Sequence, residues 1–246
     1  PTLPAGCPRT PIVLYVHGGG WRRGDKAQQI TRKVDLFARQ QGWLFISVNY
    51  RLSPDPLDLT SPTAVRAPTH AKDVAAAIGW VTRNARANGA DPTRVAIAGH
   101  SAGAHIVSTL GTDQSLLAAA KVPRASVRCV VSLDIAGFDV AQAIRVNGDL
   151  YENAFGSDPS RWRALSPLFQ ITKGEALPDF LAITQRTRWL ESTNRTFRDA
   201  LVAAGGTATL RSVPLDHNGI NAAVGTTGDK LVTPPLMAFL TPCLAR

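Results

Sequence analysis

The chain has 246 residues, of which 44% are hydrophobic and 18% are charged. A chain of this length and composition buries roughly three quarters of its unfolded surface, which excludes a disordered chain, a small peptide scaffold and a coiled coil. Its longest apolar stretches have the length of strands, well short of the roughly 18 to 20 apolar residues that a membrane-spanning helix needs. We therefore expect one globular domain over residues 1–246, with no membrane span.

The basic residues outnumber the acidic residues by 27 to 18, which gives a formal net charge of +9. Such a charge is common in proteins that bind nucleic acids or anionic surfaces. Here 21 of the basic residues are arginines, and no run is longer than the pair Arg22 and Arg23. Because a protein that follows a phosphate backbone clusters its charge, we interpret these arginines as a solvated surface and expect no nucleic-acid partner.

Apolar runs with the length of strands alternate with segments of helical periodicity. This alternation is typical of an α/β fold in which helices cover both faces of a mostly parallel sheet. The predicted strands are residues 11–16, 43–48, 94–98, 127–133, 180–184 and 208–213. The predicted helices are residues 26–40, 69–88, 102–110, 192–204 and 234–240, and residues 53–68 are predicted to form a long surface loop.

Residues 134–178 form an unusually long connection between two predicted strands. Aromatic residues lie in it among turn-forming residues: Phe138, Tyr151, Phe155, Trp162 and Phe169. Connections of this length in α/β enzymes usually shape a binding site. We expect this insertion to do so, with Phe138 and Trp162 in contact with substrate, although core packing explains any single one of these aromatics equally well.

The three cysteines cannot all pair within one chain, so the sequence is not a disulfide-rich scaffold. Cys129 lies in an apolar run and is predicted to be a buried, unreactive thiol. Cys7 and Cys243 lie near the two termini, which are often close together in a domain, so a Cys7–Cys243 disulfide is a hypothesis. The first residue is Pro1 and not Met, as removal of a signal peptide would leave it, and a secreted or periplasmic location is compatible with this start.

The strongest local motif is GHSAG at residues 99–103, which follows an apolar strand and precedes a helix of small residues. In a sharp turn from strand to helix, side chains at the two glycine positions would collide with neighbouring backbone. The turn directs the Ser101 hydroxyl above the sheet, at the positive end of the following helix. Ser101 is therefore the predicted nucleophile, and a glycine-rich turn without chemistry is the alternative.

A second motif, HGGGW at residues 17–21, also follows a predicted strand directly. Glycines allow backbone N–H groups to converge on one point, as an oxyanion hole requires. We predict that the amides of Gly19, Gly20 and Ala102 are the donors, and that Trp21 and His100 contact substrate. A phosphate-binding loop is the rival interpretation, but the sequence has neither of the usual phosphate-loop spacings here.

These motifs resemble those of the α/β-hydrolase family, in particular carboxylesterases with an HGGGW loop, in the branch of feruloyl esterases and kynurenine formamidases. The resemblance also includes NYRLSP at 49–54, DVAAAIGWV at 73–81 and GHSAGAH at 99–105. It implies an α/β-hydrolase fold, a triad of serine, acid and histidine, and hydrolysis of carboxylic esters through an acyl-enzyme. It also implies a small-molecule ester as partner and no cofactor. No group of His, Cys and carboxylate residues in the sequence has the spacing of metal ligands, so we expect no metal. Cleavage of aryl-formamides or amides on the same triad is an alternative.

The resemblance assigns the catalytic base to His217, in the segment LDHNGI after the last predicted strand. A triad base usually comes from a late loop that lies over the strand ends, and among the five histidines this describes His217. His17 belongs to the glycine-rich loop, and His100 precedes the nucleophile. His70 and His105 lie in predicted helices, where a structural role explains them.

The third member of the triad departs from the family pattern. The acid usually follows the strand predicted at 180–184, but this chain has Arg188 near that place. Asp134 closes the preceding strand and is the predicted acid, because any rigid carboxylate at that distance can fix the imidazole and stabilise its cation. Glu191 and Asp139 are the alternatives. A weak or absent acid would leave a binding protein without catalysis on a hydrolase scaffold.

Two further expectations follow from the resemblance. The family normally has one or two antiparallel strands before the HGGGW strand, and about ten residues are available for them here, so the sheet is either shortened or preceded by sequence that this chain lacks. The aromatic content of residues 134–178 favours esters with short acyl or aryl groups as substrates.

Overall fold

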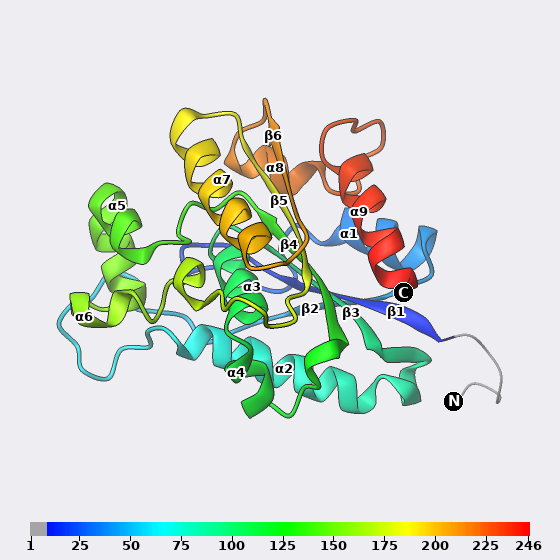
Figure 1. Ribbon diagram of the computed structural model, residues 1–246, viewed down its shortest axis with the longest axis horizontal. Helices are drawn as coiled ribbons and strands as arrows, with labels where there is room; N and C mark the ends of the chain where they lie inside the picture. Colours follow the sequence, from blue (N-terminus) through cyan, green and yellow to red (C-terminus); the bar gives the residue numbers. More distant parts are fainter. Residues whose placement is uncertain (1–8) are drawn as a thin grey trace.

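The computed structural model describes residues 9–246, and its centre is one sheet of six strands. The strands are β1 (Thr10–Val16), β2 (Leu44–Val48), β3 (Ala90–His100), β4 (Val127–Leu133), β5 (Asp179–Gln185) and β6 (Ala208–Val213). Their order across the sheet is β2-β1-β3-β4-β5-β6, and each neighbouring pair is parallel. Parallel strands need long crossover connections, and each connection here contains a helix (Figure 1). The predicted parallel α/β fold is confirmed.

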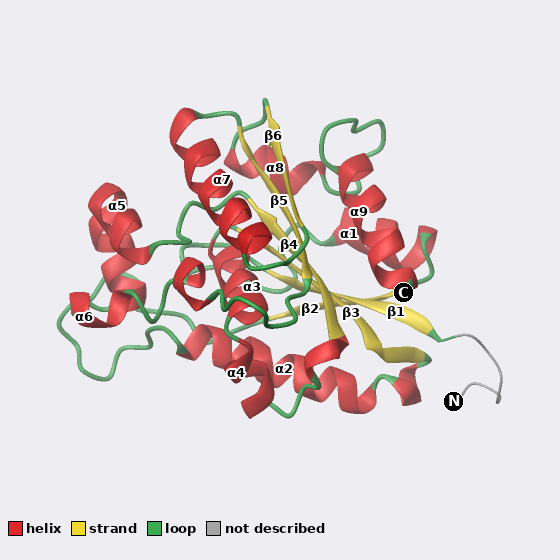
Figure 2. Cartoon of the chain, in the orientation of Figure 1, coloured by secondary structure: helices red, strands yellow, loops and turns green. Residues whose placement is uncertain are grey.

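Helices cover both faces of the sheet, so its central strands are buried on both sides (Figure 2). In β1, Ile12 and Leu14 pack into one hydrophobic cluster and Val13 and Tyr15 into the other. The first cluster includes residues of α2 (Thr69–Asn84), α3 (Ala102–Thr112), α4 (Gln114–Ala119), α5 (Val140–Phe155) and α7 (Arg188–Ala203). The second includes the π-helix Asp35–Gln40 that continues α1 (Thr31–Val34), together with α8 (His217–Ala223) and α9 (Thr233–Ala245). Burial on both faces explains why the strands read as continuous apolar runs.

The helices differ from the predicted ones in several places, of which three bear on the site. The helix expected at 26–40 begins at Thr31, and residues 217–223 form a helix that the sequence did not indicate. Residues 134–178 contain α5, α6 (Pro159–Trp162) and a short 3-10 helix (Pro167–Gln170) instead of a long irregular loop. The backbone of α5 is interrupted at Asn147, which breaks its helical periodicity. None of the helices in residues 9–246 is long and apolar enough to cross a bilayer.

The C-terminal helix is linked covalently to the sheet. Cys129 in β4 and Cys243 in α9 form a disulfide, and both residues are buried. The prediction of a free thiol at Cys129 is therefore wrong. The hypothesis of a Cys7–Cys243 bridge is also wrong, because Cys243 already has a partner; Cys7 itself lies outside the described residues. The two bonded cysteines are 114 residues apart in sequence, and only the packing of α9 against the sheet brings them together.

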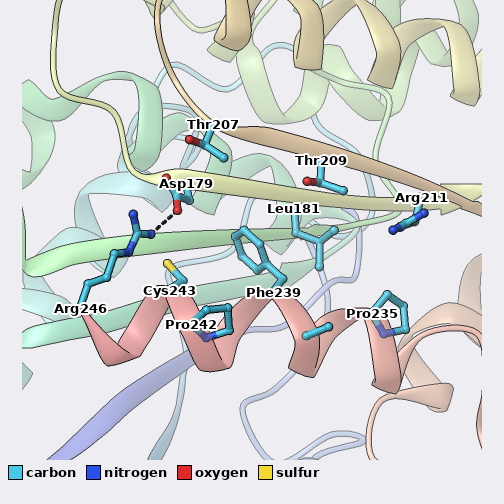
Figure 3. A pocket seen from close by; sticks show the side chains of 11 residues that line it. Asp179, Leu181, Thr207, Thr209, Arg211, Pro235, Phe239, Pro242, Cys243 and Arg246 are labelled. Atoms are coloured by element: carbon cyan, nitrogen blue, oxygen red, sulfur yellow. Dashed lines mark hydrogen bonds and ion pairs between the residues drawn. The ribbon is translucent and has the colours of Figure 1, made fainter.

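A surface groove lies beside this disulfide, between α9 and strands β5 and β6 (Figure 3). Its volume is about 510 Å³, its apolar lining includes Leu181 and Phe239, and an ion pair between Asp179 and Arg246 lies at one end. None of the residues that the sequence predicts for the active site lines this groove.

Four of the five histidines are buried, with 2 to 6% of each residue exposed. Burial lowers the pKa of His70 and of His100 to about 4 and that of His105 to about 3. Burial also lowers the pKa of His17 below its ordinary value. These imidazoles are therefore neutral in the folded protein at neutral pH.

We expect the variant Cys129→Ala/Cys243→Ala to lower the free energy of unfolding by about 2–5 kcal/mol, because the disulfide no longer restricts the unfolded chain. Urea denaturation of the variant, and of the wild type with and without reductant, measures this change. An unfolding midpoint that is the same in all three samples would contradict a stabilising bond between β4 and α9.

We also expect the free energy of unfolding to fall as the pH falls from 7 to 5. Unfolded histidine binds a proton at a pKa of about 6.5, so the unfolded state holds more protons than the folded state between about pH 4 and 6.5. Between pH 7 and pH 5 the loss is roughly 2 kcal/mol for each of His70, His100 and His105. Carboxylates with a lowered pKa in the folded state reduce the free energy of unfolding only at lower pH, where they become protonated. Urea denaturation at pH 7, 6 and 5 tests the slope, and a constant free energy would contradict it.

Candidate active site

Ser101 occupies the sharp turn between β3 and α3. Its backbone angles are φ 56° and ψ −121°. A residue other than glycine keeps this strained conformation only where the surrounding contacts enforce it. The amide of Ser101 donates to the carbonyl oxygen of Leu133 at 2.9 Å, which ties the turn to the end of β4. A Cβ at Gly99 would overlap the carbonyl oxygen of Gly103, and one at Gly103 would overlap that of Val16. The turn therefore requires glycine at both positions of the motif.

His217 and Asp134 form a hydrogen-bonded pair. Nδ1 of His217, the first residue of α8, donates to Oδ2 of Asp134 at 2.6 Å. Asp134 follows the last residue of β4, and 2% of it is exposed. Its carboxylate also accepts hydrogen bonds from Gln185, through the backbone N at 2.8 Å and Nε2 at 2.7 Å, and from Thr184 Oγ1 at 3.1 Å. Four donors thus fix the carboxylate.

The environment of Asp134 keeps its carboxylate ionised. Burial alone raises the pKa of this group, but the hydrogen bonds from His217 and Gln185 outweigh burial and hold the pKa below its ordinary value. An ionised carboxylate can only accept, so the hydrogen of the neutral His217 ring lies on Nδ1. Nε2 of His217 is then left with a lone pair, as a general base requires.

The other two candidate acids lie elsewhere. Among residues 9–246, Asp134 is the only carboxylate within 4.0 Å of a nitrogen of the His217 ring. Asp139 caps the N-terminus of α5, where its side chain accepts from the Gln142 amide at 3.2 Å. Glu191 lies in the first turn of α7.

The glycine-rich loop passes close to Ser101. A Cβ at Gly18 would lie 3.0 Å from the Ser101 Cβ, so the loop could not approach Ser101 this closely with a larger residue there. Gly19 has φ +108° and Gly20 has φ +60°, and both line a groove that also contains Ser101. Ala102, the third predicted amide donor, is the first residue of α3. The motif HGGGW signalled this loop, but the contact made by Gly18 was not predicted.

His100 supports the residue predicted to be the base. Its Nε2 donates to the backbone oxygen of His217 at 2.9 Å, and the two ring centroids are 4.5 Å apart. Because His100 is neutral, its ring can lie against His217 without placing a positive charge beside it. His100 also lines the groove beside Ser101, so it holds His217 and borders the space predicted for substrate.

Two spaces adjoin Ser101 and His217, and Gly20 and Leu150 line both of them. The first, which we call the polar groove, has a volume of about 480 Å³. Its polar side chains include Tyr15, Arg22, Arg23, Gln28, Gln29, Asn218 and Asn221. The second, the apolar cavity, has a volume of about 270 Å³. Its apolar side chains include Trp21, Ile135, Ala136, Leu150, Tyr151, Trp189 and Leu190.

The structure does not bring all of the predicted substrate-binding aromatics to Ser101. Trp21 lines the apolar cavity, although only 2% of it is exposed. Phe138 stacks on Phe197 with 4.0 Å between ring centroids, inside the core. Trp162 donates from Nε1 to the carbonyl oxygen of Gly156 at 2.8 Å. Neither Phe138 nor Trp162 is among the described residues that line the groove or the cavity, where α5 supplies the wall instead.

Known proteins with related sequences include two curated hydrolases. Esterase LipQ of Mycobacterium tuberculosis is 26% identical over 94% of this chain and 55% of its own length. A probable N-octanoylanthranilate hydrolase, AqdA2 of Rhodococcus erythropolis, is 32% identical over 61% of this chain and 32% of its own length. The chain therefore spans less than two thirds of these relatives.

Solved structures confirm the fold. Esterase B of Lactobacillus rhamnosis, in complex with a tributyrin phosphonate inhibitor, superposes with a TM-score of 0.77 at 21% identity. The superposition covers 96% of this chain and 77% of that protein. The family described as BD-FAE matches residues 3–176, which is most of the chain. The chain therefore belongs to the BD-FAE family of α/β-hydrolase esterases.

Proposed function

We propose that the protein is a serine carboxylesterase that hydrolyses its substrates through an acyl-enzyme. The observation that carries this proposal is the hydrogen bond from His217 to the buried carboxylate of Asp134, beside Ser101 in its strained turn. Membership of an esterase family supports it, as do relatives described as esterases.

In the proposed reaction, Ser101 attacks the acyl carbon while Nε2 of His217 takes the hydroxyl proton. The ionised Asp134 stabilises the imidazolium that forms and keeps its ring in place. His217 then gives the proton to the leaving alcohol, which departs and leaves the acyl group on Ser101. A water molecule attacks the acyl-enzyme by the same route, and the carboxylic acid is released.

The negative charge that develops on the substrate carbonyl oxygen needs donors in place before the reaction. We assign this role to the backbone amides of Gly19, Gly20 and Ala102. Each such donor typically contributes on the order of 3 kcal/mol to the stabilisation of the transition state. The close approach of the glycine-rich loop to Ser101 supports the assignment.

The two spaces beside Ser101 suggest how an ester is bound. The apolar cavity suits a short acyl or aryl group, and the polar groove suits a part of the substrate that forms hydrogen bonds. We propose that the insertion at 134–178 shapes the site through α5, since Leu150 and Tyr151 lie in the wall of the cavity.

Cleavage of an N-acyl bond is a second candidate for the same site. The relative described as a probable N-octanoylanthranilate hydrolase favours it. The resemblance of the HGGGW loop at residues 17–21 to that of kynurenine formamidases also favours it. The triad chemistry would be unchanged, with an amine instead of an alcohol as the leaving group.

A fluorophosphonate probe should label Ser101 in a one-to-one ratio, because only an activated serine reacts readily. Ser101→Ala should abolish labelling and lower kcat for p-nitrophenyl acetate by several orders of magnitude. The matched control is Ser192→Ala, at an exposed serine in α7. Mass spectrometry of the labelled proteins reads the result. Equal labelling of wild type and Ser101→Ala would contradict the proposal.

Asp134→Asn should lower kcat about 10⁴-fold, because the amide favours the wrong tautomer of His217. Glu191→Gln serves as the control and should retain nearly all activity, since Glu191 lies away from the His217 ring. Steady-state kinetics of both variants decides between the two acids. Loss of activity in Glu191→Gln with normal turnover in Asp134→Asn would reverse the assignment.

Leu190→Phe should shift the preference of the enzyme toward shorter acyl groups, because it reduces the volume of the apolar cavity. The measurement is kcat/KM for p-nitrophenyl esters of increasing chain length. Val202→Phe, at an exposed position of α7, is the control. An unchanged preference in Leu190→Phe would mean that the acyl group binds outside this cavity.

A further inference from the structure

Lys33 is a buried cation near the site that the proposed reaction does not use. Only 1% of it is exposed. Its Nζ donates to the carbonyl oxygens of Gln29 at 2.9 Å and Asn221 at 3.1 Å, and it lies 4.9 Å from the centroid of the Tyr15 ring. None of the ion pairs among residues 9–246 includes Lys33. Burying a cation without a carboxylate partner costs desolvation free energy, so we expect Lys33 to have a role that offsets this cost.

The contact with Asn221 connects Lys33 to the helix that carries His217. Asn221 lies four residues after His217, about one turn along α8. The last four carbonyl groups of a helix have no partner within it, and a cation there also complements the helix dipole. At the other end of α8, the Asp216 side chain accepts from the Gly219 amide at 2.6 Å. Both ends of this seven-residue helix are therefore held by charged side chains.

The side chain of Asn221 is fixed as well. The Tyr15 hydroxyl donates to its Oδ1 at 2.6 Å, and its Nδ2 donates to Oε1 of Gln29 at 2.6 Å. Burial raises the pKa of Tyr15, so its hydroxyl remains a donor. Tyr15 comes from β1, while Gln29 and Lys33 come from the segment that leads into α1 and from α1 itself. These contacts attach α8 to the sheet and to α1.

We propose that Lys33 is a positioning residue for His217: by holding Asn221, it fixes α8 and thereby the direction of the His217 ring toward Ser101. The inference rests on the proposed function, in which His217 is the base. Tyr15, Gln29 and Asn221 also line the polar groove, whereas Lys33 does not line either space. Replacement of Lys33 therefore changes the support of His217 without removing a substrate contact.

The charge of Lys33 gives a second way to test this role. Burial lowers the pKa of Lys33 to about 8, and the nearby Arg32 acts in the same direction. The other titratable groups that face it are Tyr15 from β1 and His100 from β3, which are neutral at this pH. As the pH rises past about 8, Lys33 loses its charge and its hold on the two carbonyl groups weakens.

The test compares Lys33→Met, which keeps an unbranched side chain one atom shorter but cannot donate, with Lys33→Gln, which can donate. Lys26→Met, at an exposed lysine upstream of α1, is the matched control. We measure kcat and KM for one p-nitrophenyl ester at pH 7, with active sites counted by fluorophosphonate labelling and the folded fraction measured by near-ultraviolet circular dichroism.

Lys33→Met should lower kcat per active site by about ten- to a hundredfold, because small displacements of a reacting group have effects of this size. KM should stay the same, Lys33→Gln should recover part of kcat, and Lys26→Met should behave as wild type. A loss of activity that only follows the folded fraction, or a change in KM alone, would overturn the positioning role.

The pH profile adds an independent readout. In the wild type, kcat should decline above about pH 8, and this decline should be absent in Lys33→Met. A decline that persists in the variant would overturn the role of the charge. If the wild type neither hydrolyses the ester nor reacts with the probe, the proposed function fails. If the wild type is active and Lys33→Met keeps its kcat and its pH profile, only the positioning role fails.

Discussion

The hydrogen bond between His217 and Asp134 joins parts of the chain that are 83 residues apart, and the candidate site depends on it. The parallel sheet makes it possible, because strands that run in one direction end at the same edge. β3 ends just before Ser101, and β4 ends just before Asp134. Backbone hydrogen bonds from Ser101 to Leu133 and from Asp134 to Ile183 keep these ends in register. The proposed nucleophile, Ser101, and the proposed acid, Asp134, are thus fixed by the sheet itself, and only the imidazole comes from a separate element.

Because His217 lies on a short helix outside the sheet, its position depends on contacts from several sides. Asp134 accepts from the ring, and His100 donates to its backbone oxygen. We propose that Lys33 holds the far end of α8 through Asn221. These supports come from the end of β4, from β3 and from α1, so the proposed base is connected to both the sheet and one layer of helices. Burying the charge of Lys33 costs free energy of folding, but this charge lies close to the proposed site. There a fixed geometry has the greatest effect on the reaction rate.

Local sequence patterns predicted the parts of the protein that local physics determines. Strands buried on both faces appear as apolar runs, and the turn at Ser101 has a fixed glycine spacing because close backbone contacts demand it. Asp134 could be proposed only as one of three acids, since its distance from His217 depends on the whole sheet. The kink at Asn147 concealed α5. The disulfide between β4 and α9 and the burial of Lys33 arise from packing between distant segments, and no local pattern signals either one.

Proton NMR in water measures the hydrogen bond of His217 directly. The account predicts a resonance far downfield of the backbone amides, from the hydrogen that Nδ1 of His217 donates to Asp134. This resonance should be present in the wild type and in Glu191→Gln, and absent in Asp134→Ala and His217→Gln. A spectrum without it, or a resonance that survives in Asp134→Ala, would contradict the pairing on which the proposed chemistry depends.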